Sequence, residues 1–440
     1  MHYMRIGTYI KKRIVGPVHL WLGLASGLII VIVSTTGCIY VFEKELKAIF
    51  YRNNIVVNTD LYDRGVEEML PISTLLDRAN TEVPTHFKAT EIKFHGPRKS
   101  CYVQYYKRKE HAEDKKFIWY TNDYDYLFRV FLNPYSGEVL KVENTQWEFF
   151  WLIKELHSSL LIGPIGTTVI SVSILIFVLM LITGIVLWWP HNWKSLRLGT
   201  WFYWKSATKW KRKNYDLHNV PGFYMLFFAL IISITGLSWS FDWMKNSIIW
   251  TGNGGNLTEI NWPKVKSNLE IANQQLGVDK VQAELFSQYP TASAHRIFFS
   301  RDSIAPTMAI PYQREDIIDS WQYFDQYSGE KLDELSFAEM TSGEKLYFYG
   351  YSMHVGSILS FPGKVLAFFA ALVSASLPVT GFFIWWNRRK KPKGKGKKNG
   401  RNHDEKKLTK NSPTLLKSQK PKKRKSKEAN PVINIKPTYN

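Results

Sequence analysis

Four long apolar segments interrupt an otherwise polar chain. They cover residues 18–42, 166–189, 220–241 and 365–386, and none of them contains a charged side chain. At 1.5 Å per helical residue, each is long enough to cross about 30 Å of hydrocarbon. We therefore predict four transmembrane helices. The first is longer than a signal-peptide core and lacks a small-residue cleavage site, so we expect an uncleaved signal anchor.

Lysine and arginine are concentrated in the short segments beside these spans. Residues 1–17 carry four, the loop 190–217 carries seven and residues 387–440 carry twenty. The two long loops, 43–156 and 242–353, together carry 26 basic and 33 acidic residues. Because positive charge in short flanks stays on the cytoplasmic side, we expect both termini and the short loop in the cytoplasm and both long loops outside.

The net charge of +21 belongs mainly to the C-terminal segment 387–440, which has twenty basic and three acidic residues. We expect this tail to be disordered and cytoplasmic, and do not expect a nucleic-acid partner. It could attract anionic lipid or an acidic electron donor, or it could be a solvated tail that only reinforces the topology. The two isolated cysteines, Cys38 and Cys101, exclude a disulfide scaffold, an iron–sulfur cluster and a cysteine zinc site.

The two halves of the chain repeat one another. A Thr-Gly pair lies in every span: Thr36-Gly37, Thr183-Gly184, Thr235-Gly236 and Thr380-Gly381. Asn133–Glu138 resembles Asp325–Glu330, and both contain Tyr-Ser-Gly-Glu. Each half therefore reads as span, outer domain and span, as in an internal duplication.

Both outer segments show α/β patterning. In the first we expect a helix near 72–80, strands near 91–94, 102–106 and 127–132, and a turn at 135–137. In the second we expect a helix over 267–276 that stops at Gly277, and strands near 296–300 and 321–324. Neither segment contains a nucleophile elbow, a phosphate-binding loop or an HExxH motif.

Four histidines lie at the ends of the four spans. His19 and His218 begin the first and third spans, and His157 and His354 precede the second and fourth. The topology places one pair at each membrane face, and polar ligand-type side chains at such depth are usually functional. Two imidazoles on opposite sides of a porphyrin suit electron transfer, so we predict haem ligation by His19 with His218 and by His157 with His354. A non-haem metal or purely structural roles are the alternatives.

A porphyrin also needs flat space beside its ligands. Gly23 follows His19 by four residues, on the same helical face, and Gly222 has the same offset from His218. We therefore include both glycines in the candidate haem site. The Gly23–Gly27 spacing is equally typical of simple helix packing. Of the other histidines, one could contact a substrate among those in the outer segments, namely His86, His95, His111 and His295.

The chain resembles the PepSY-associated transmembrane family, the iron-regulated membrane proteins that include ferric-siderophore reductases. The resemblance rests on His19-Leu-Trp-Leu-Gly23, Leu156-His157, the Thr-Gly pairs, the Tyr-Ser-Gly-Glu turns and Leu187-Trp188-Trp189, and it covers about residues 14–390. It implies four spans, two periplasmic PepSY-like domains and two b-type haems held by the four span-end histidines. It also implies a bacterial inner-membrane location. Some relatives carry a fused flavodoxin- or reductase-like domain after the last span, and this chain has a basic tail instead.

The resulting hypothesis is a di-haem oxidoreductase that takes electrons from a cytoplasmic donor, for example a flavoprotein. We expect it to reduce a ferric siderophore or another ferric chelate, docked between the outer domains, and so release the iron. One alternative is a non-redox protein whose outer domains bind a peptide or a protease. Another is a ferri-siderophore transporter, which the absence of charged residues from the spans disfavours.

Overall fold

The computed structural model describes residues 9–57, 68–109, 119–269, 277–314 and 316–389. The predicted basic tail therefore lies outside the described residues, apart from its first three positions. Four helices are long and apolar enough to cross a membrane, as the sequence predicted, and the chain is a multi-pass membrane protein. They are α2 (Gly16–Tyr40), α7 (Gly163–Trp188), α9 (Trp210–Leu237) and α14 (Ser360–Arg389).

The helices begin before the apolar runs that predicted them. Both α2 and α7 have proline in the first helical turn, where the missing N–H has no intrahelical partner to lose. Helix α9 begins ten residues before the predicted span, and α8 (Trp193–Thr200) precedes it. Arg212 and Asp216 form an ion pair at i,i+4 in this extension, at 2.9 Å. Hydropathy marks where a chain enters lipid, whereas a helix continues into water as long as its side chains support it.

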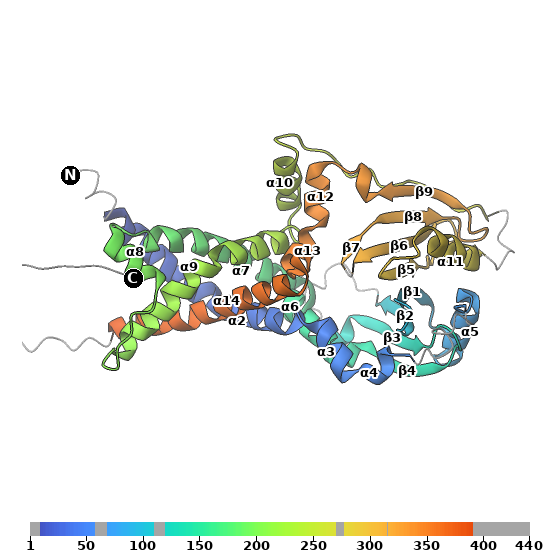
Figure 1. Ribbon diagram of the computed structural model, residues 1–440, viewed down its shortest axis with the longest axis horizontal. Helices are drawn as coiled ribbons and strands as arrows, with labels where there is room; N and C mark the ends of the chain where they lie inside the picture. Colours follow the sequence, from blue (N-terminus) through green and yellow to red (C-terminus); the bar gives the residue numbers. More distant parts are fainter. Residues whose placement is uncertain (1–8, 58–67, 110–118, 270–276, 315, 390–440) are drawn as a thin grey trace, which may run out of the picture. The chain divides into compact units, whose positions relative to one another are not determined.

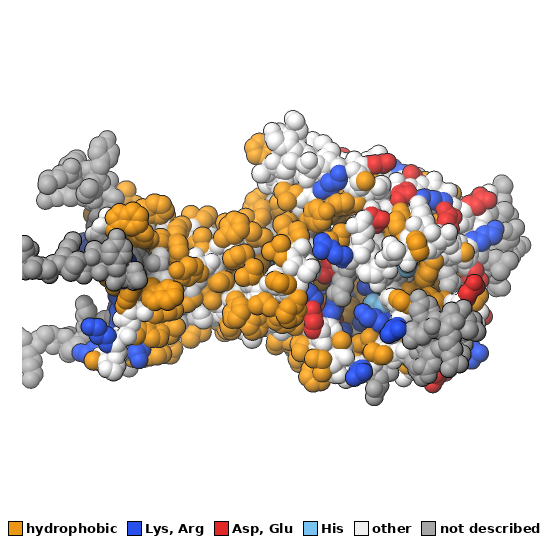
Figure 2. Space-filling model, in the orientation of Figure 1, with side chains coloured by type: hydrophobic (Ala, Val, Ile, Leu, Met, Phe, Trp, Pro, Cys, Tyr) orange, Lys and Arg blue, Asp and Glu red, His pale blue; other side chains and the backbone are white. Residues whose placement is uncertain are grey.

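The long helices form a four-membered bundle (Figure 1). Helices α2 and α9 each pack against both α7 and α14, so that α2 lies diagonally opposite α9. Large apolar side chains such as Leu28, Leu179 and Phe227 remain exposed on the outside of the bundle. Figure 2 shows this apolar covering along the bundle, as expected of helices whose neighbours are lipid.

Nine antiparallel strands form one sheet, in the order β4-β3-β2-β1-β5-β6-β8-β9, with β7 paired to β6. The strands are β1 (Ala89–His95), β2 (Cys101–Arg108), β3 (Tyr124–Leu132), β4 (Val139–Asn144), β5 (Ala294–Phe298), β6 (Thr307–Arg314), β7 (Ile317–Ile318), β8 (Ser320–Phe324) and β9 (Lys331–Ser336). After Asn133 and Asp325 the chain turns tightly through Gly137 and Gly329, both with φ of +70°, which favours glycine.

The two expected outer domains share this sheet, a junction that the sequence did not predict. Strand β1 of the first half pairs with β5 of the second from Glu91–Phe298 to His95–Ala294. One apolar core contains Ile92 and Val103 from the first half together with Leu285 and Ile297 from the second. Because hydrogen-bonded strands fill the junction of β1 and β5, a chelate docked there would lie on a face of the sheet rather than in a gap between two domains.

Helices α5 (Ile72–Thr81) and α11 (Gly277–Gln288) cover one face of the sheet and contact each other. The predicted helix over 267–276 is wrong at its described residues: 267–269 are not α-helical, and Gly277 starts a helix. A Cβ on Gly277 would lie 2.5 Å from the Tyr327 carbonyl oxygen, so glycine serves close packing here. Residues 270–276 are outside the described residues.

Shorter helices link the bundle to the sheet. They are α3 (Glu43–Phe50), α4 (Arg52–Ile55), α6 (Phe149–Ser159), α10 (Asp242–Gly252), α12 (Ser342–Phe348) and α13 (Gly350–His354). Two ion pairs connect the elements of this region. Lys44 contacts Asp316 and Lys364 contacts Glu45, each at 2.6 Å. Helix α6 packs against α2, and α13 packs against α9.

Candidate functional site

The four span-end histidines come together as two pairs. The ring centres of His19 on α2 and His218 on α9 are 6.5 Å apart, with ring planes at 88°. Those of His157 on α6 and His354 on α13 are 6.2 Å apart, with planes at 78°. The structure therefore pairs the residues that the sequence analysis paired, and each pair combines the first half of the chain with the second.

Tight glycine contacts position the second pair. A Cβ on Gly166 would lie 1.7 Å from the carbonyl oxygen of Ser159, and a Cβ on Gly363 would lie 2.0 Å from that of Gly356. Only glycine allows α6 and the turn after α13 to fold back so closely on the start of the following span. These contacts set the positions of His157 and His354 and explain why each histidine precedes such a glycine by the same number of residues.

A threonine on another helix accepts a hydrogen bond from each histidine. The Nδ1 atoms of His19 and His218 lie 2.9 Å from Thr183 Oγ1 and Thr380 Oγ1. The outer histidines make the same contact at 3.1 Å, His157 with Thr36 and His354 with Thr235. Each Thr-Gly pair thus contacts the histidine that lies at the same membrane face, and it does so from a different helix. These pairs are visible in the sequence as a repeat, but nothing in the sequence indicates this role.

The hydrogen bonds fix which ring nitrogen carries the proton. Each of these threonine hydroxyls donates to a carbonyl of its own helix, as Thr183 does to Leu179 at 2.9 Å, so its oxygen accepts from the histidine. The Nδ1 of His157 also lies 2.9 Å from the Val33 carbonyl oxygen, which can only accept. Nδ1 therefore carries the proton in a neutral ring, and Nε2 keeps the lone pair that a metal needs.

The glycine of each Thr-Gly pair makes room for the same imidazole. Built Cβ atoms on Gly236, Gly37, Gly381 and Gly184 would lie 3.2, 3.3, 3.4 and 3.5 Å from the Cε1 of the neighbouring histidine. Contacts below 3.4 Å are tighter than ordinary packing allows. The dipeptide thus has two functions at once, since threonine holds the ring and glycine lets its Cε1 edge approach the helix closely.

The spacing within each pair fits two imidazoles on opposite sides of one iron. Taking metal–nitrogen bonds of about 2 Å and the roughly 1.2 Å from a ring nitrogen to its ring centre, such ligands have ring centres about 6.4 Å apart. The observed spacings are 6.5 and 6.2 Å. Among the described residues, no three His, Cys, Asp or Glu side chains converge as a closed non-haem metal site requires.

The surroundings of the inner pair are apolar and adjustable. A cavity of about 40 Å³ borders His19 and His218 and is lined by Gly23, Ile30, Phe177 and other mainly apolar residues. The Cε methyl of Met180 would contact a Cβ on Gly23 at 2.7 Å, and Leu377 would contact one on Gly222 at 3.2 Å. Both predicted glycines therefore face the ends of flexible side chains, which must swing aside to admit a macrocycle.

The two pairs lie at different depths of the bundle. His19 and Thr36, the partner of His157, are on the same helix and about 25 Å apart along its axis. This length covers most of a roughly 30 Å hydrocarbon core. The predicted exclusion of ligand pairs that cross the membrane, such as His19 with His157, follows from this separation.

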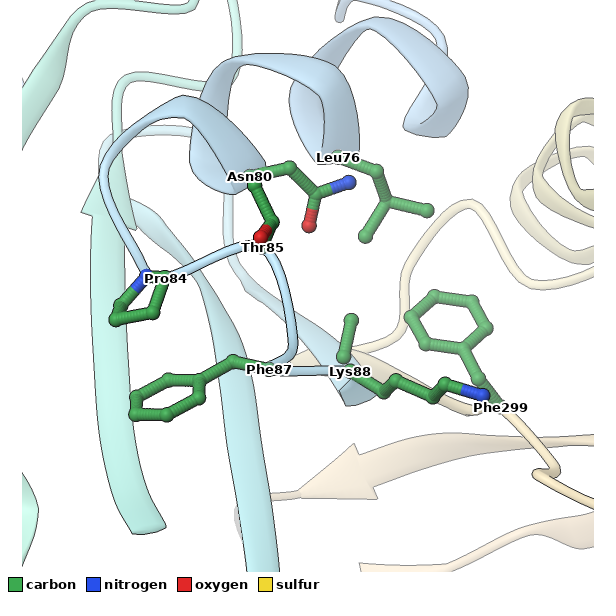
Figure 3. A pocket seen from close by; sticks show the side chains of 8 residues that line it. Leu76, Asn80, Pro84, Thr85, Phe87, Lys88 and Phe299 are labelled. Atoms are coloured by element: carbon green, nitrogen blue, oxygen red, sulfur yellow. The ribbon is translucent and has the colours of Figure 1, made fainter.

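A larger pocket lies away from the histidines. It measures about 450 Å³ and is formed by α5, the loop before β1 and Phe299. Figure 3 shows Asn80 and Leu76 on one side and Lys88 near Phe299 on the other. Among the described residues that line it, Lys88 is the single ionisable one, and these residues offer no pair of groups for acid–base chemistry. His295 also has a structural role, because its Nε2 lies 3.0 Å from the Tyr289 carbonyl oxygen and its ring stacks on Phe286.

Comparison with known proteins places the chain in a family. No curated protein matches the chain significantly. The family model described as the PepSY-associated TM region matches residues 17–388, from the start of α2 to the end of α14. The chain therefore belongs to the PepSY-associated TM region family.

Proposed function

We propose that this protein is a di-haem membrane oxidoreductase that carries electrons from a cytoplasmic donor to a ferric chelate in the periplasm. The observation that carries the proposal is the presence of two histidine pairs with ring centres 6.5 and 6.2 Å apart. Haem bound at each pair would supply one-electron chemistry between ferric and ferrous iron. The loss of an electron to a ferric siderophore would convert its iron to the ferrous form, which binds hard oxygen ligands less strongly.

The residues of the chain would perform three tasks in this activity. His19 with His218, and His157 with His354, would bind the two haem irons through Nε2. The four threonines would hold the rings and keep the proton on Nδ1, as outer contacts of metal-binding histidines commonly do. Apolar residues around the inner pair would exclude water and favour electron transfer over side reactions.

The orientation proposed here follows from the distribution of charge. The basic residues of the short flanks favour a cytoplasmic His19–His218 pair, and the sheet would then lie in the periplasm of a bacterial inner membrane. Corresponding contacts in the two halves support an origin by duplication. A flavoprotein donor and anionic lipid at the basic tail are part of the same proposal.

The test is electron transfer across a sealed membrane. The protein is reconstituted into liposomes so that its His19–His218 end faces the interior. Dithionite is enclosed inside the liposomes. A ferric chelate and a colorimetric ferrous-iron indicator are added outside. We expect ferrous iron to appear outside with the wild-type protein and to be lost in both His19→Ala and His157→Ala. Ferrous iron production that survives both substitutions would refute the proposal.

A further inference from the structure

A group of basic side chains lies on the sheet face opposite α5 and α11. Lys93 alternates along β1 with Ile92 and Phe94, which face the helix-covered core, so its side chain points to the other face. Arg296 of β5 is directly opposite Lys93 in the pairing of the two halves. With Lys44, His95 and Arg129 they form what we call the cationic cluster. Figure 2 shows Lys, Arg and His side chains gathered next to the apolar bundle surface.

The charges of this cluster are only partly balanced. Arg296 pairs with Glu91 at 2.5 Å, and Lys44 pairs with Asp316 at 2.6 Å. Among the described residues, neither Lys93 nor Arg129 has a carboxylate partner. Glu143, opposite Arg129 on β4, pairs with Lys141 at 2.9 Å, so within the described part of the chain Lys93 and Arg129 form no ion pair of their own.

The two unbalanced cations contact rings and an amide instead. The Lys93 Nζ lies 5.2 Å from the centre of the Tyr312 ring. Arg129 lies over the ring of Tyr102 at 4.9 Å and donates to the side-chain oxygen of Gln104 at 2.7 Å. Such contacts leave most of the hydrogen-bonding capacity of an ammonium or a guanidinium free for a ligand.

Lys93 is held in an unfavourable environment. Burial, followed by the charges of Arg296 and Lys44, lowers its pKa to about 8, although Glu91 and Asp316 act in the opposite direction. Burial and the nearby Lys93, Lys99, Lys44 and Arg129 also hold the pKa of His95 well below its usual value. An aromatic ring offsets only part of the cost of burying an ammonium group. A bound anion would remove the remaining cost.

The cationic cluster adjoins α13, the helix that carries His354. Asp316, the ion-pair partner of Lys44, accepts a hydrogen bond through its backbone carbonyl from Ser352 on α13 at 3.1 Å. The ring centre of Trp239 is 6.2 Å from that of Tyr351 and 5.0 Å from that of His354. The cluster is therefore next to the helix that positions one ligand of the outer pair.

We propose that the cationic cluster is the docking site for a ferric chelate with negatively charged carboxylate groups, which Lys93 and Arg129 bind directly. This inference rests on the proposed reductase function and names its substrate class, an anionic polycarboxylate chelate. Carboxylate groups would give Lys93 and Arg129 the charged hydrogen-bond partners that their ring contacts do not supply, and such charge-assisted hydrogen bonds are the strong ones. A neutral chelate would leave both cations uncompensated.

The test uses gallium(III) citrate, a redox-inert analogue of ferric citrate, and isothermal titration calorimetry on the full chain in detergent. We expect Lys93→Gln to weaken binding about ten- to hundredfold, as for the loss of a hydrogen bond to a charged group. Lys93→Arg keeps the charge and should restore most of the affinity. The matched control, Lys88→Gln, removes an exposed lysine just before the same strand and should bind like the wild type.

Three results would overturn the proposal: no binding of gallium citrate by the wild type, equal affinity in Lys93→Gln, or citrate alone binding as tightly as its gallium complex. Because gallium(III) is not reduced under these conditions, its binding does not depend on electron transfer. If gallium citrate binds as expected but the dithionite-reduced protein is not reoxidised by ferric citrate, the docking site stands and the reductase proposal fails.

Discussion

Adding one methyl group at Gly236 should disturb the outer histidine pair selectively. The new Cβ would lie 3.2 Å from His354 Cε1 and 3.7 Å from its Nδ1, so the ring must retreat by a few tenths of an ångström. Its hydrogen bonds to Ile232 and Thr235 resist this movement. Overpacking of this kind costs about 1–3 kcal/mol, which corresponds to roughly a 5- to 150-fold loss of affinity for a ligand of that ring.

The assay follows haem release from each variant to an excess of a haem-scavenging apoprotein. We expect one of two haems to leave Gly236→Ala much faster than the wild type. The effect should decrease through Gly37→Ala, Gly381→Ala and Gly184→Ala, because the distance from the added Cβ to the histidine Cε1 lengthens from 3.3 to 3.4 and 3.5 Å. Gly96→Ala is the control, since a Cβ there meets nothing within 4 Å. Unchanged haem release from Gly236→Ala, or equal effects at all four sites, would refute the reasoning.

Further variants test the other contacts. Thr183→Val removes the hydroxyl that holds His19 and should weaken haem binding at the inner pair about 10- to 100-fold, measured by haem titration, while the outer pair keeps its affinity. Arg296→Met leaves the buried Glu91 carboxylate unpaired and should lower the free energy of unfolding by about 3 kcal/mol in thermal denaturation, whereas the double variant with Glu91→Gln should recover most of it. Affinity for gallium citrate should fall as the pH rises above about 8, because the Lys93 ammonium, whose pKa is about 8, is charged below that pH and loses its proton above it. A pH-independent affinity in the wild type, or the same decrease in Lys93→Arg, would contradict this assignment, since arginine stays charged.

The membrane architecture and the histidine pairs were accessible from the sequence because both have strong local signals. Uncharged runs longer than 20 residues have few interpretations other than spans. The pairing of His19 with His218 followed from the topology and the repeat, without knowledge of any contact. The role of the Thr-Gly pairs was not accessible in this way, because Thr183 and His19 are far apart in sequence and meet only when α2 packs against α7.

In the outer region, the sequence predicted individual strands but not how they pair. Alternation of apolar residues predicted most of the central strands but carried no information on which strand edges meet, so β1–β5 pairing and the single sheet were missed. Gly277 was read as a helix stop because glycine often ends helices. In the structure, glycine is needed at this position because the Tyr327 carbonyl oxygen lies too close to leave room for a Cβ atom. In the sequence, Lys93 is indistinguishable from other lysines on the polar face of a strand. Only its contacts in the structure set it apart.

The measurement that tests the central claim most directly is pyridine haemochrome quantitation of the purified protein, expressed with adequate haem supply. The account predicts about two b-type haems per chain in the wild type. It predicts about one in His19→Ala or His218→Ala and about one in His157→Ala or His354→Ala, with the remaining haem at the intact pair. A wild-type protein without haem, or a haem content that none of these four substitutions changes, would contradict it.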